Sequence, residues 1–320
     1  MGGYQGLRSV EAPIRVLYIA GAGHSGSTFL DIMLGNHPDV FGAGELSNLP
    51  RGGWIDNEYC TCGRQANDCP FWSYVRRVWV EKVGVDDLEG YLKLEDSFER
   101  IRCLPRLLWE RRKPSARFQR YTERTRALFE AVREVSGKAV IVDSSKSPAR
   151  AFALAMMPDI DLYLIHLVRD GRGVATSHKK TWRKDLQAGV TRDVKRRSVW
   201  ETTARWVSVN LGTEWVRFLL RSEKSVRLRY EDYVADPKEA SDKIGQMVDL
   251  DFTEVSSTVS AGGALQAGHN IAGNHLRMSG TVRLVPETGQ WRNKGALSAG
   301  ERRLSWILMG WLLRRYEYKK

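Results

Sequence analysis

Apolar runs alternate with segments of helical period along much of the chain. The clearest runs cover residues 14–20, 139–142 and 162–168, and each leads through a glycine or polar turn into apolar residues at helical spacing. A shorter alternating run covers 225–230. Strand, turn and helix in this repeated order predict βα units around a parallel sheet, and therefore an α/β fold with helices flanking the sheet.

Two regions interrupt this pattern. Between about residues 50 and 135 the chain is rich in Trp, Arg and Cys and shows no clear strand, which we interpret as an inserted helical cap. A second insertion, roughly 180–221, also has helical spacing, with apolar residues from Val199 to Trp215 near one face. We predict a single domain over 1–320, in which the helical insertions form a substrate cap.

Polar residues follow each of the later predicted strands. They lie in Asp143–Pro148, in Arg169–Gly173 and at Glu231-Asp232, and helices are expected to begin at Pro148 and near Asp236-Pro237. In an open α/β sheet the ligand crevice lies outside the carboxyl ends of the strands. These segments are therefore expected to converge on the loop that follows the first strand.

That first loop, residues 21–28, has the sequence GAGHSGST. Its glycines allow backbone N–H groups to approach an anion, and the helix that follows adds partial positive charge, so the loop resembles a phosphate-binding loop. A nucleoside triphosphatase would carry lysine where this chain has Ser27. The loop is P-loop-like, and it favours an anion of lower charge than a triphosphate, such as a phosphosulfate, held without a metal.

Charge and hydropathy narrow the class of protein. Fifty basic and 38 acidic residues leave a formal charge of +12, which suits a polyanion, a membrane surface or a polyphosphorylated small molecule. No apolar run approaches the roughly 18 residues of a membrane span, and residues 1–8 lack the apolar core of a signal peptide. The expectation is a soluble cytoplasmic protein with no membrane partner.

Three of the four cysteines lie close together, at Cys60, Cys62 and Cys69. A zinc site needs a fourth ligand, which neither the spacing nor a neighbouring histidine supplies, and a disulfide would be unusual in a reducing cytosol. Structural thiols or an occasional disulfide are the favoured interpretation. A metal site remains the alternative.

Four segments together resemble the sulfotransferases that use 3′-phosphoadenosine 5′-phosphosulfate. The loop looks like the family's 5′-phosphosulfate loop, and Arg169 followed eight residues later by Ser177 matches its 3′-phosphate pair. The segment 228–233 is similar to the family's tyrosine-acidic element. Residues 269–277 with Trp291 resemble the C-terminal segment that closes over the nucleotide.

The resemblance implies a co-substrate and the residues that bind it. The donor would be 3′-phosphoadenosine 5′-phosphosulfate, the product adenosine 3′,5′-bisphosphate, and no metal would be needed. The implied donor-binding residues are Gly23, His24, Ser25, Gly26, Ser27, Thr28, Arg169, Ser177, Tyr230, Asn274, Arg277 and Trp291.

Sulfuryl transfer to a hydroxyl needs a base for the acceptor proton and cations at the departing oxygen. Glu45 follows His24 by the spacing at which the base glutamate of tyrosylprotein sulfotransferases follows their loop arginine, so Glu45 is the predicted base. Lys146 looks like the lysine that contacts the transferring group. His24 stands where relatives carry arginine or lysine, and it is expected to donate a hydrogen bond, with a role as base or in structure as alternatives.

Two other functions compete with this interpretation. A P-loop nucleotide kinase or triphosphatase shares the strand-loop-helix, but the loop lysine is missing. A nucleic-acid-binding protein would fit the positive charge, but the basic residues are dispersed rather than interleaved with aromatic residues in a stacking platform. A small hydroxylated molecule is the expected acceptor, glycans and peptide tyrosine remain open, and the oligomeric state is not assigned.

Overall fold

A five-stranded parallel sheet forms the centre of the molecule, in a computed structural model that describes residues 12–179, 181, 183–185, 187, 196–286, 288–293 and 295–320. The N-terminal stretch 1–8 and much of the second predicted insertion before residue 196 lie outside these residues. The strand order is β2-β3-β1-β4-β5, and every neighbouring pair is parallel. The strands are β1 (Ile14–Ala20), β2 (Val40–Gly42), β3 (Val140–Lys146), β4 (Ile160–Val168) and β5 (Ser225–Arg229).

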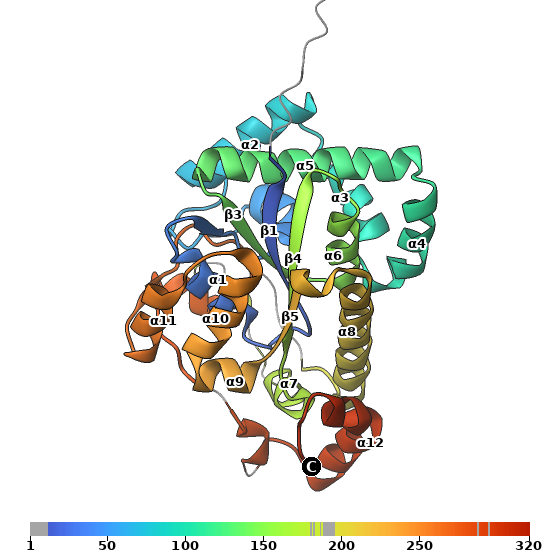
Figure 1. The fold of residues 1–320 in the computed structure, drawn as a ribbon, viewed down its shortest axis with the longest axis vertical. Coiled ribbons are helices and arrows are strands. Elements are labelled where there is room, and N and C mark those ends of the chain that lie inside the picture. Colours follow the sequence, from blue (N-terminus) through green and yellow to red (C-terminus); the bar gives the residue numbers. More distant parts are fainter. Residues whose placement is uncertain are drawn as a thin grey trace, which may run out of the picture.

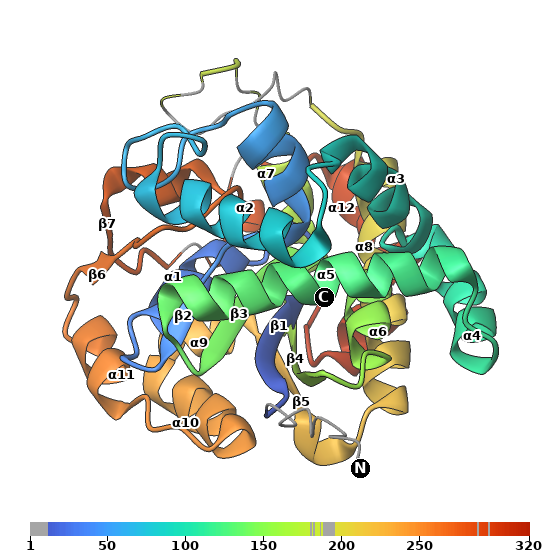
Figure 2. The same ribbon diagram turned by 90° about the horizontal axis from the view of Figure 1, so that it is seen from above.

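Helices cover both faces of the sheet, because side chains that alternate along a strand point to opposite sides. In β1, Val16 and Tyr18 pack into one buried cluster, whereas Leu17 and Ile19 pack into another. Figures 1 and 2 show the sheet between these two helical layers. The first cluster is shared with α5 (Ala116–Ser136) and α6 (Pro148–Ala155), and the second with α1 (Ser27–Gly35), α10 (Pro237–Val248) and α11 (Thr253–Ser260).

The predicted cap is helical, as the sequence indicates. It runs from a π-helical segment, Leu49–Ile55, into a set of helices that ends with α5. A fully buried guanidinium ties this cap to the sheet: Arg150 donates to Asp143 of β3 at 2.9 Å and also to Glu99 of the cap. The cap helices before α5 are α2 (Pro70–Val83), α3 (Leu88–Phe98) and α4 (Leu104–Arg112).

The C-terminal half adds helices beyond β4. A short helix, α7, begins directly after Asp170, and the C-terminal helix α12 packs against it and against α8 (Figure 1). A two-stranded antiparallel ribbon lies between α11 and α12. The remaining elements are α7 (Gly171–Ser177), α8 (Val199–Leu219), α9 (Tyr230–Ala235), β6 (Leu265–Gln266), β7 (Thr281–Val282) and α12 (Ala299–Arg315).

The observed strands differ from the predicted ones in several places, since β4 begins two residues early and the short strands β2, β6 and β7 were not predicted. β2 was not predicted, because three residues are too few to show an alternating pattern. β3 continues to Lys146, through polar residues that the sequence assigned to a turn. Asp143 and Ser144 are buried in this extension, so polarity was a poor guide to where the strand ends. Among the described residues, no helix is long and apolar enough to cross a membrane.

Candidate active site

The carboxyl ends of all five parallel strands bring the predicted site residues to one edge of the sheet, as an α/β fold requires. The loop follows β1, Lys146 ends β3, and Arg169 follows β4. Glu45 lies just after β2, and Tyr230 comes directly after β5. Residues separated by more than 200 positions in the sequence are therefore neighbours here.

The loop after β1 has the backbone of an anion cradle. Gly26 has φ of 89° and precedes the first residue of α1, so backbone N–H groups at the helix N-terminus face the loop. A Cβ at Gly26 would lie 2.5 Å from the ring of Tyr230, which leaves space for glycine alone. Ser27 and Thr28 begin the helix, where a P-loop would have its lysine and metal-binding hydroxyl.

His24 lies in the middle of the loop with a left-handed backbone, φ 63°. Its Nδ1 shares a hydrogen bond of 3.0 Å with the hydroxyl of Ser177, and its ring meets the edge of His178 at 4.3 Å between centroids. Sequence analysis placed His24 and Ser177 in one site, and the fold brings them into contact.

The surroundings of His24 disfavour a positive charge on its ring. Desolvation comes first, and repulsion from His178, Lys146 and Arg169 adds to it, which lowers the pKa of His24 to about 3. By its solvent accessibility His24 is an exposed residue, so solvent screens part of this repulsion and reduces the size of the shift in pKa. The direction of the shift nevertheless gives a neutral imidazole at pH 7. His24 can donate or accept a hydrogen bond there, but it does not replace the permanent cation of related loops.

Arg169 is held between the loop and β5. Its Nη1 donates to the carbonyl of His24 at 2.9 Å, and its guanidinium carbon lies 4.4 Å from the centre of the Tyr230 ring. Tyr230 thus packs under both Arg169 and Gly26. The tyrosine ring thus holds the arginine beside the loop, and Ser177 of α7 reaches the same loop through His24.

Glu45 and Lys146 form an ion pair beside the loop. The lysine donates to Oε1 of Glu45, while Nδ2 of Asn48 donates to Oε2 at 2.7 Å. The Lys146 and Glu45 side chains are 20% and 16% exposed, so both are within reach of a ligand. Lys146 has φ of 70°, a strained value for a non-glycine residue, and such strain concentrates at functional sites.

A segment near the C-terminus, residues 269–277, lies against the site from the other side, and we call it the closing segment. Glu45 donates its N–H to the carbonyl of Ile271 at 3.0 Å, and Asn274 donates its N–H to Oγ1 of Thr28 at 3.1 Å. Gly273, with φ of 95°, lies between these contacts, and a Cβ there would meet Thr28 Oγ1 at 3.0 Å. The segment therefore connects Glu45, the predicted base, to α1, the helix that follows the loop.

Asp31, which sequence analysis missed, anchors both sides of this arrangement. It is fully buried on α1 and accepts from the N–H of Gly44 at 3.1 Å and from Nδ2 of Asn270 at 2.6 Å. Burial raises the pKa of Asp31 to about 8. The available signal was a lone acidic residue within the apolar stretch from Phe29 to Leu34, where it has no solvent-facing side.

Three predicted donor-binding side chains occupy other positions. The side chain of Asn274 accepts from the N–H of Leu276 at 2.9 Å and so caps its own turn, which leaves only its backbone on the loop helix. Arg277 is fully buried and donates to the carbonyl of Tyr59 at 2.9 Å. Trp291 packs against Arg172, whose guanidinium carbon lies 3.7 Å from the ring centre. Within the described residues, the hydrogen bonds and ring contacts given for these three side chains do not involve the loop, and their assignment to donor binding stays a prediction.

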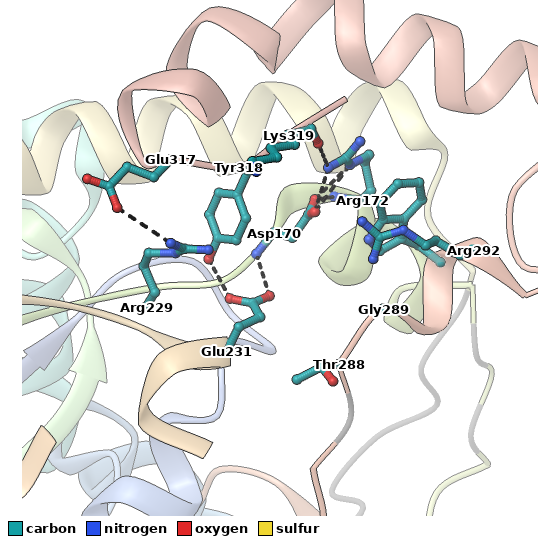
Figure 3. A pocket seen from close by; sticks show the side chains of 11 residues that line it. Asp170, Arg172, Arg229, Glu231, Thr288, Gly289, Arg292, Glu317, Tyr318 and Lys319 are labelled. Carbon is teal, nitrogen blue, oxygen red and sulfur yellow. Dashed lines mark hydrogen bonds and ion pairs between the residues drawn. The ribbon is translucent and has the colours of Figure 1, made fainter. Parts of the chain in front are cut away.

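A cavity of about 480 Å³ lies beside the N-terminus of α7, lined in part by Asp170, Arg172 and Arg292. In Figure 3, Arg172 turns toward Asp170 and the carbonyl of Lys319, and Tyr318 reaches Glu231. The lining includes none of the loop residues 23–28, nor Glu45 or Lys146. Base, cation and anion cradle meet at the loop instead, so the loop is the better candidate for the chemistry.

The cysteines have a neighbour that the sequence did not suggest. His269, some 200 residues further along, places Nδ1 3.3 Å from Sγ of Cys69 and 3.6 Å from Sγ of Cys60. The four side chains Cys60, Cys62, Cys69 and His269 offer ligand atoms that all lie within 4.8 Å of one another. The expectation that no histidine completes the set is therefore wrong, because the fold supplies one from the closing segment.

Comparison with known proteins shows the family of this chain. A model of the sulfotransferase family matches residues 17–254, which include the loop, Glu45, Lys146 and Arg169 but not the closing segment. A sulfotransferase domain from the curacin biosynthetic pathway has a similar fold, with a TM-score of 0.50, 15% identity and coverage of 96% of this chain and 99% of that one.

Two other solved structures are similar at lower scores. A sulfotransferase domain from the Synechococcus PCC 7002 olefin synthase has a TM-score of 0.48 and 17% identity, covering 97% of this chain and 96% of that one. The sulfotransferase STF9 from Mycobacterium avium has a TM-score of 0.47 and 12% identity, covering 96% and 78%. No curated protein matches this chain.

Proposed function

Because this chain belongs to the sulfotransferase family, we propose that it transfers a sulfuryl group from 3′-phosphoadenosine 5′-phosphosulfate to a hydroxyl of a small molecule. The observation that carries the proposal is the pair of Glu45 and Lys146 beside the loop. A carboxylate and an ammonium at one anion cradle provide both of the groups that this reaction needs.

Glu45 is the proposed base. Transfer to a hydroxyl removes its proton, and a carboxylate within hydrogen-bond reach accepts that proton as the oxygen attacks sulfur. Asn48 holds one carboxylate oxygen by its 2.7 Å hydrogen bond, and the backbone contact to Ile271 fixes the main chain. The carboxylate is thus positioned before an acceptor arrives.

Lys146 is the proposed cation at the departing oxygen. The donor supplies the sulfuryl group and a phosphate leaving group, and negative charge grows on the bridging oxygen as the bond to sulfur breaks. Lys146 reaches Glu45 now and is near enough to His24 to affect its charge. When a donor is bound, its ammonium is free to turn from the carboxylate toward that oxygen.

The loop residues 23–28 are proposed to hold the 5′-phosphosulfate, and Arg169 with Ser177 the 3′-phosphate. Two features support binding of these anionic groups: the N-terminus of α1 at Gly26, and the cations Lys146 and Arg169 near the loop. His24 is proposed as a neutral hydrogen-bond donor. Its lowered pKa makes it a poor base, so the alternative in which His24 takes the acceptor proton is disfavoured.

Limited access to the pair favours a small acceptor. Side chains that are 16% and 20% exposed are reached more readily by a small hydroxylated molecule than by a side chain on a folded protein surface. The cap beside the pair contributes the π-helical segment after Asn48 and is the region where acceptor selectivity is expected.

A transfer assay with sulfur-labelled donor and a panel of phenols, alcohols, sugars and tyrosine peptides tests this function. We expect label on at least one small hydroxyl compound, formation of adenosine 3′,5′-bisphosphate, and transfer that is at least about 100-fold slower in the Glu45→Gln variant. Phosphoryl transfer from magnesium-ATP, with no reaction of the labelled donor, would contradict the proposal.

A further inference from the structure

We propose that Cys60, Cys62, Cys69 and His269 bind a structural zinc ion that fastens the closing segment to the cap. The four residues come from two places in the chain, a loop before α2 and the segment that follows β6. This proposal does not depend on the sulfuryl-transfer reaction.

Three of the six distances among the ligand atoms are close to the edges of a zinc tetrahedron, and the other three are within 4.8 Å. With Zn–S of about 2.3 Å and Zn–N of about 2.0 Å, tetrahedral geometry gives S···S edges of about 3.8 Å and S···N edges of about 3.5 Å. The observed distances are 3.6 Å between Sγ of Cys62 and Cys69, and 3.3 and 3.6 Å from His269 Nδ1 to Cys69 and Cys60. A disulfide bond between two of these cysteines would require sulfurs about 2.05 Å apart.

Local structure orients each ligand. Cys60 and Gly63 form a tight turn, in which the N–H of Gly63 donates to the carbonyl of Cys60 at 2.9 Å. Cys69 is the residue before α2, where a helix N-terminus favours the thiolate form that binds metals. The turn thus supplies Cys60 and Cys62 and the helix start supplies Cys69, which gives three of the four ligands of a tetrahedral site.

The histidine ligand is fixed by aromatic neighbours. Phe71 stacks on the His269 ring with centroids 5.2 Å apart, and Nε1 of Trp72 donates to the His269 carbonyl at 2.7 Å. Both aromatic residues belong to α2, the helix that follows Cys69. These contacts hold the imidazole in place, as outer contacts commonly do for metal-binding histidines.

The charge of the set suits zinc. Three thiolates and a neutral imidazole around Zn²⁺ leave one net negative charge, which a nearby cation would stabilise. Arg277 is fully buried and donates a hydrogen bond to the carbonyl of Tyr59, the residue next to Cys60, so it supplies such a cation. This gives the buried Arg277 a role that the donor site does not require.

The consequence is a clip close to the active site. Thr61 donates its hydroxyl to the carbonyl of Gly268 at 2.6 Å, so the cysteine turn already touches the closing segment. A few residues beyond His269, the same segment contacts Glu45 and Thr28. Zinc would therefore set the position of the segment that holds the base and the loop helix.

Metal analysis of the full-length chain tests the proposal without any variant. The protein is purified under reducing conditions, washed with a weak chelator, and assayed for zinc, iron and copper. We expect about one zinc ion per chain. Cobalt added to metal-free protein should give visible bands of a tetrahedral site together with thiolate-to-cobalt charge transfer.

Variants then assign the ligands. Cys62→Ser removes the exposed ligand and should cut bound zinc to below about a tenth of the wild-type content and lower Tm by at least about 5 °C. Cys103→Ser changes the fourth, buried cysteine, which lies outside the cluster, and should keep full zinc. Wild-type protein without zinc that shows no cobalt spectrum, contains iron instead, or forms a disulfide between Cys62 and Cys69 would overturn the proposal.

Discussion

Replacing Glu45 with glutamine tests the role of the base with little disturbance of the site. The glutamine has nearly the same volume, and its amide oxygen still accepts from Lys146. Its amide nitrogen faces Asn48, which can turn its own amide to offer oxygen in place of the 2.7 Å donor. The folded structure and the loop should therefore persist in Glu45→Gln.

The expected magnitudes separate catalysis from binding. Loss of a general base costs about 10²- to 10⁴-fold in kcat, or roughly 3 to 5.5 kcal/mol in the barrier. Loss of a partly exposed ion pair costs under about 1 kcal/mol, so affinity for adenosine 3′,5′-bisphosphate should change less than about fivefold.

The assay compares kcat from the labelled-donor reaction with the Kd of adenosine 3′,5′-bisphosphate measured by calorimetry. Asn48→Ala is the matched control, because it removes a neighbour of the carboxylate and keeps the carboxylate itself, and its kcat should fall no more than about tenfold. A Glu45→Gln enzyme within threefold of wild-type kcat, or one that loses affinity as steeply as turnover, would refute the assignment.

Three further predictions concern the groups around this base. Lys146→Met keeps the apolar stem and should lower kcat about 10²- to 10³-fold in the same assay, and a loss below tenfold would contradict a role at the leaving oxygen. Arg169→Ala should weaken adenosine 3′,5′-bisphosphate by about one to two orders of magnitude and adenosine 5′-monophosphate by less than threefold, whereas equal losses in calorimetry would show that Arg169 only supports the loop. Folded Asp31 keeps its proton up to about pH 8, whereas the unfolded chain loses it near 3.8, so this group makes wild-type stability fall with rising pH in that window by about 1.4 kcal/mol per unit. Urea unfolding should show that the free energy of unfolding of Asp31→Asn, relative to wild type, rises by about 2 to 3 kcal/mol between pH 5 and pH 7. The same difference from wild type at both pH values would mean that Asp31 is ionised in the fold.

Local patterns were sufficient to predict the elements that carry the site. The strand over 14–20, the helix that follows the loop, and the helix starts at Pro148 and Pro237 are all confirmed, since each has apolar periodicity next to glycine or proline. The family and the α/β fold are confirmed as well. The site assignments themselves stay predictions, although the fold gathers Glu45, Lys146, His24 and Arg169 at one edge.

Contacts between distant segments could not be read from the sequence. His269 meets Cys69 only because the closing segment folds back across the cap, and Asp31 meets Asn270 for the same reason. The charge state of His24 also depends on burial and on His178, Lys146 and Arg169, so the fold disfavours the cation that relatives carry at this position. Such properties arise from packing, which periodicity does not encode.

Binding of adenosine 3′,5′-bisphosphate in the absence of magnesium tests the central claim most directly. Calorimetry should give a one-to-one complex with this nucleotide, a markedly weaker complex with adenosine 5′-monophosphate, and competition by the phosphosulfate donor. The loop lacks the P-loop lysine, and Arg169 lies beside it, so the site should select a 3′-phosphate over a magnesium-bound triphosphate. Tight binding of magnesium-ATP, with no binding of adenosine 3′,5′-bisphosphate, would contradict it.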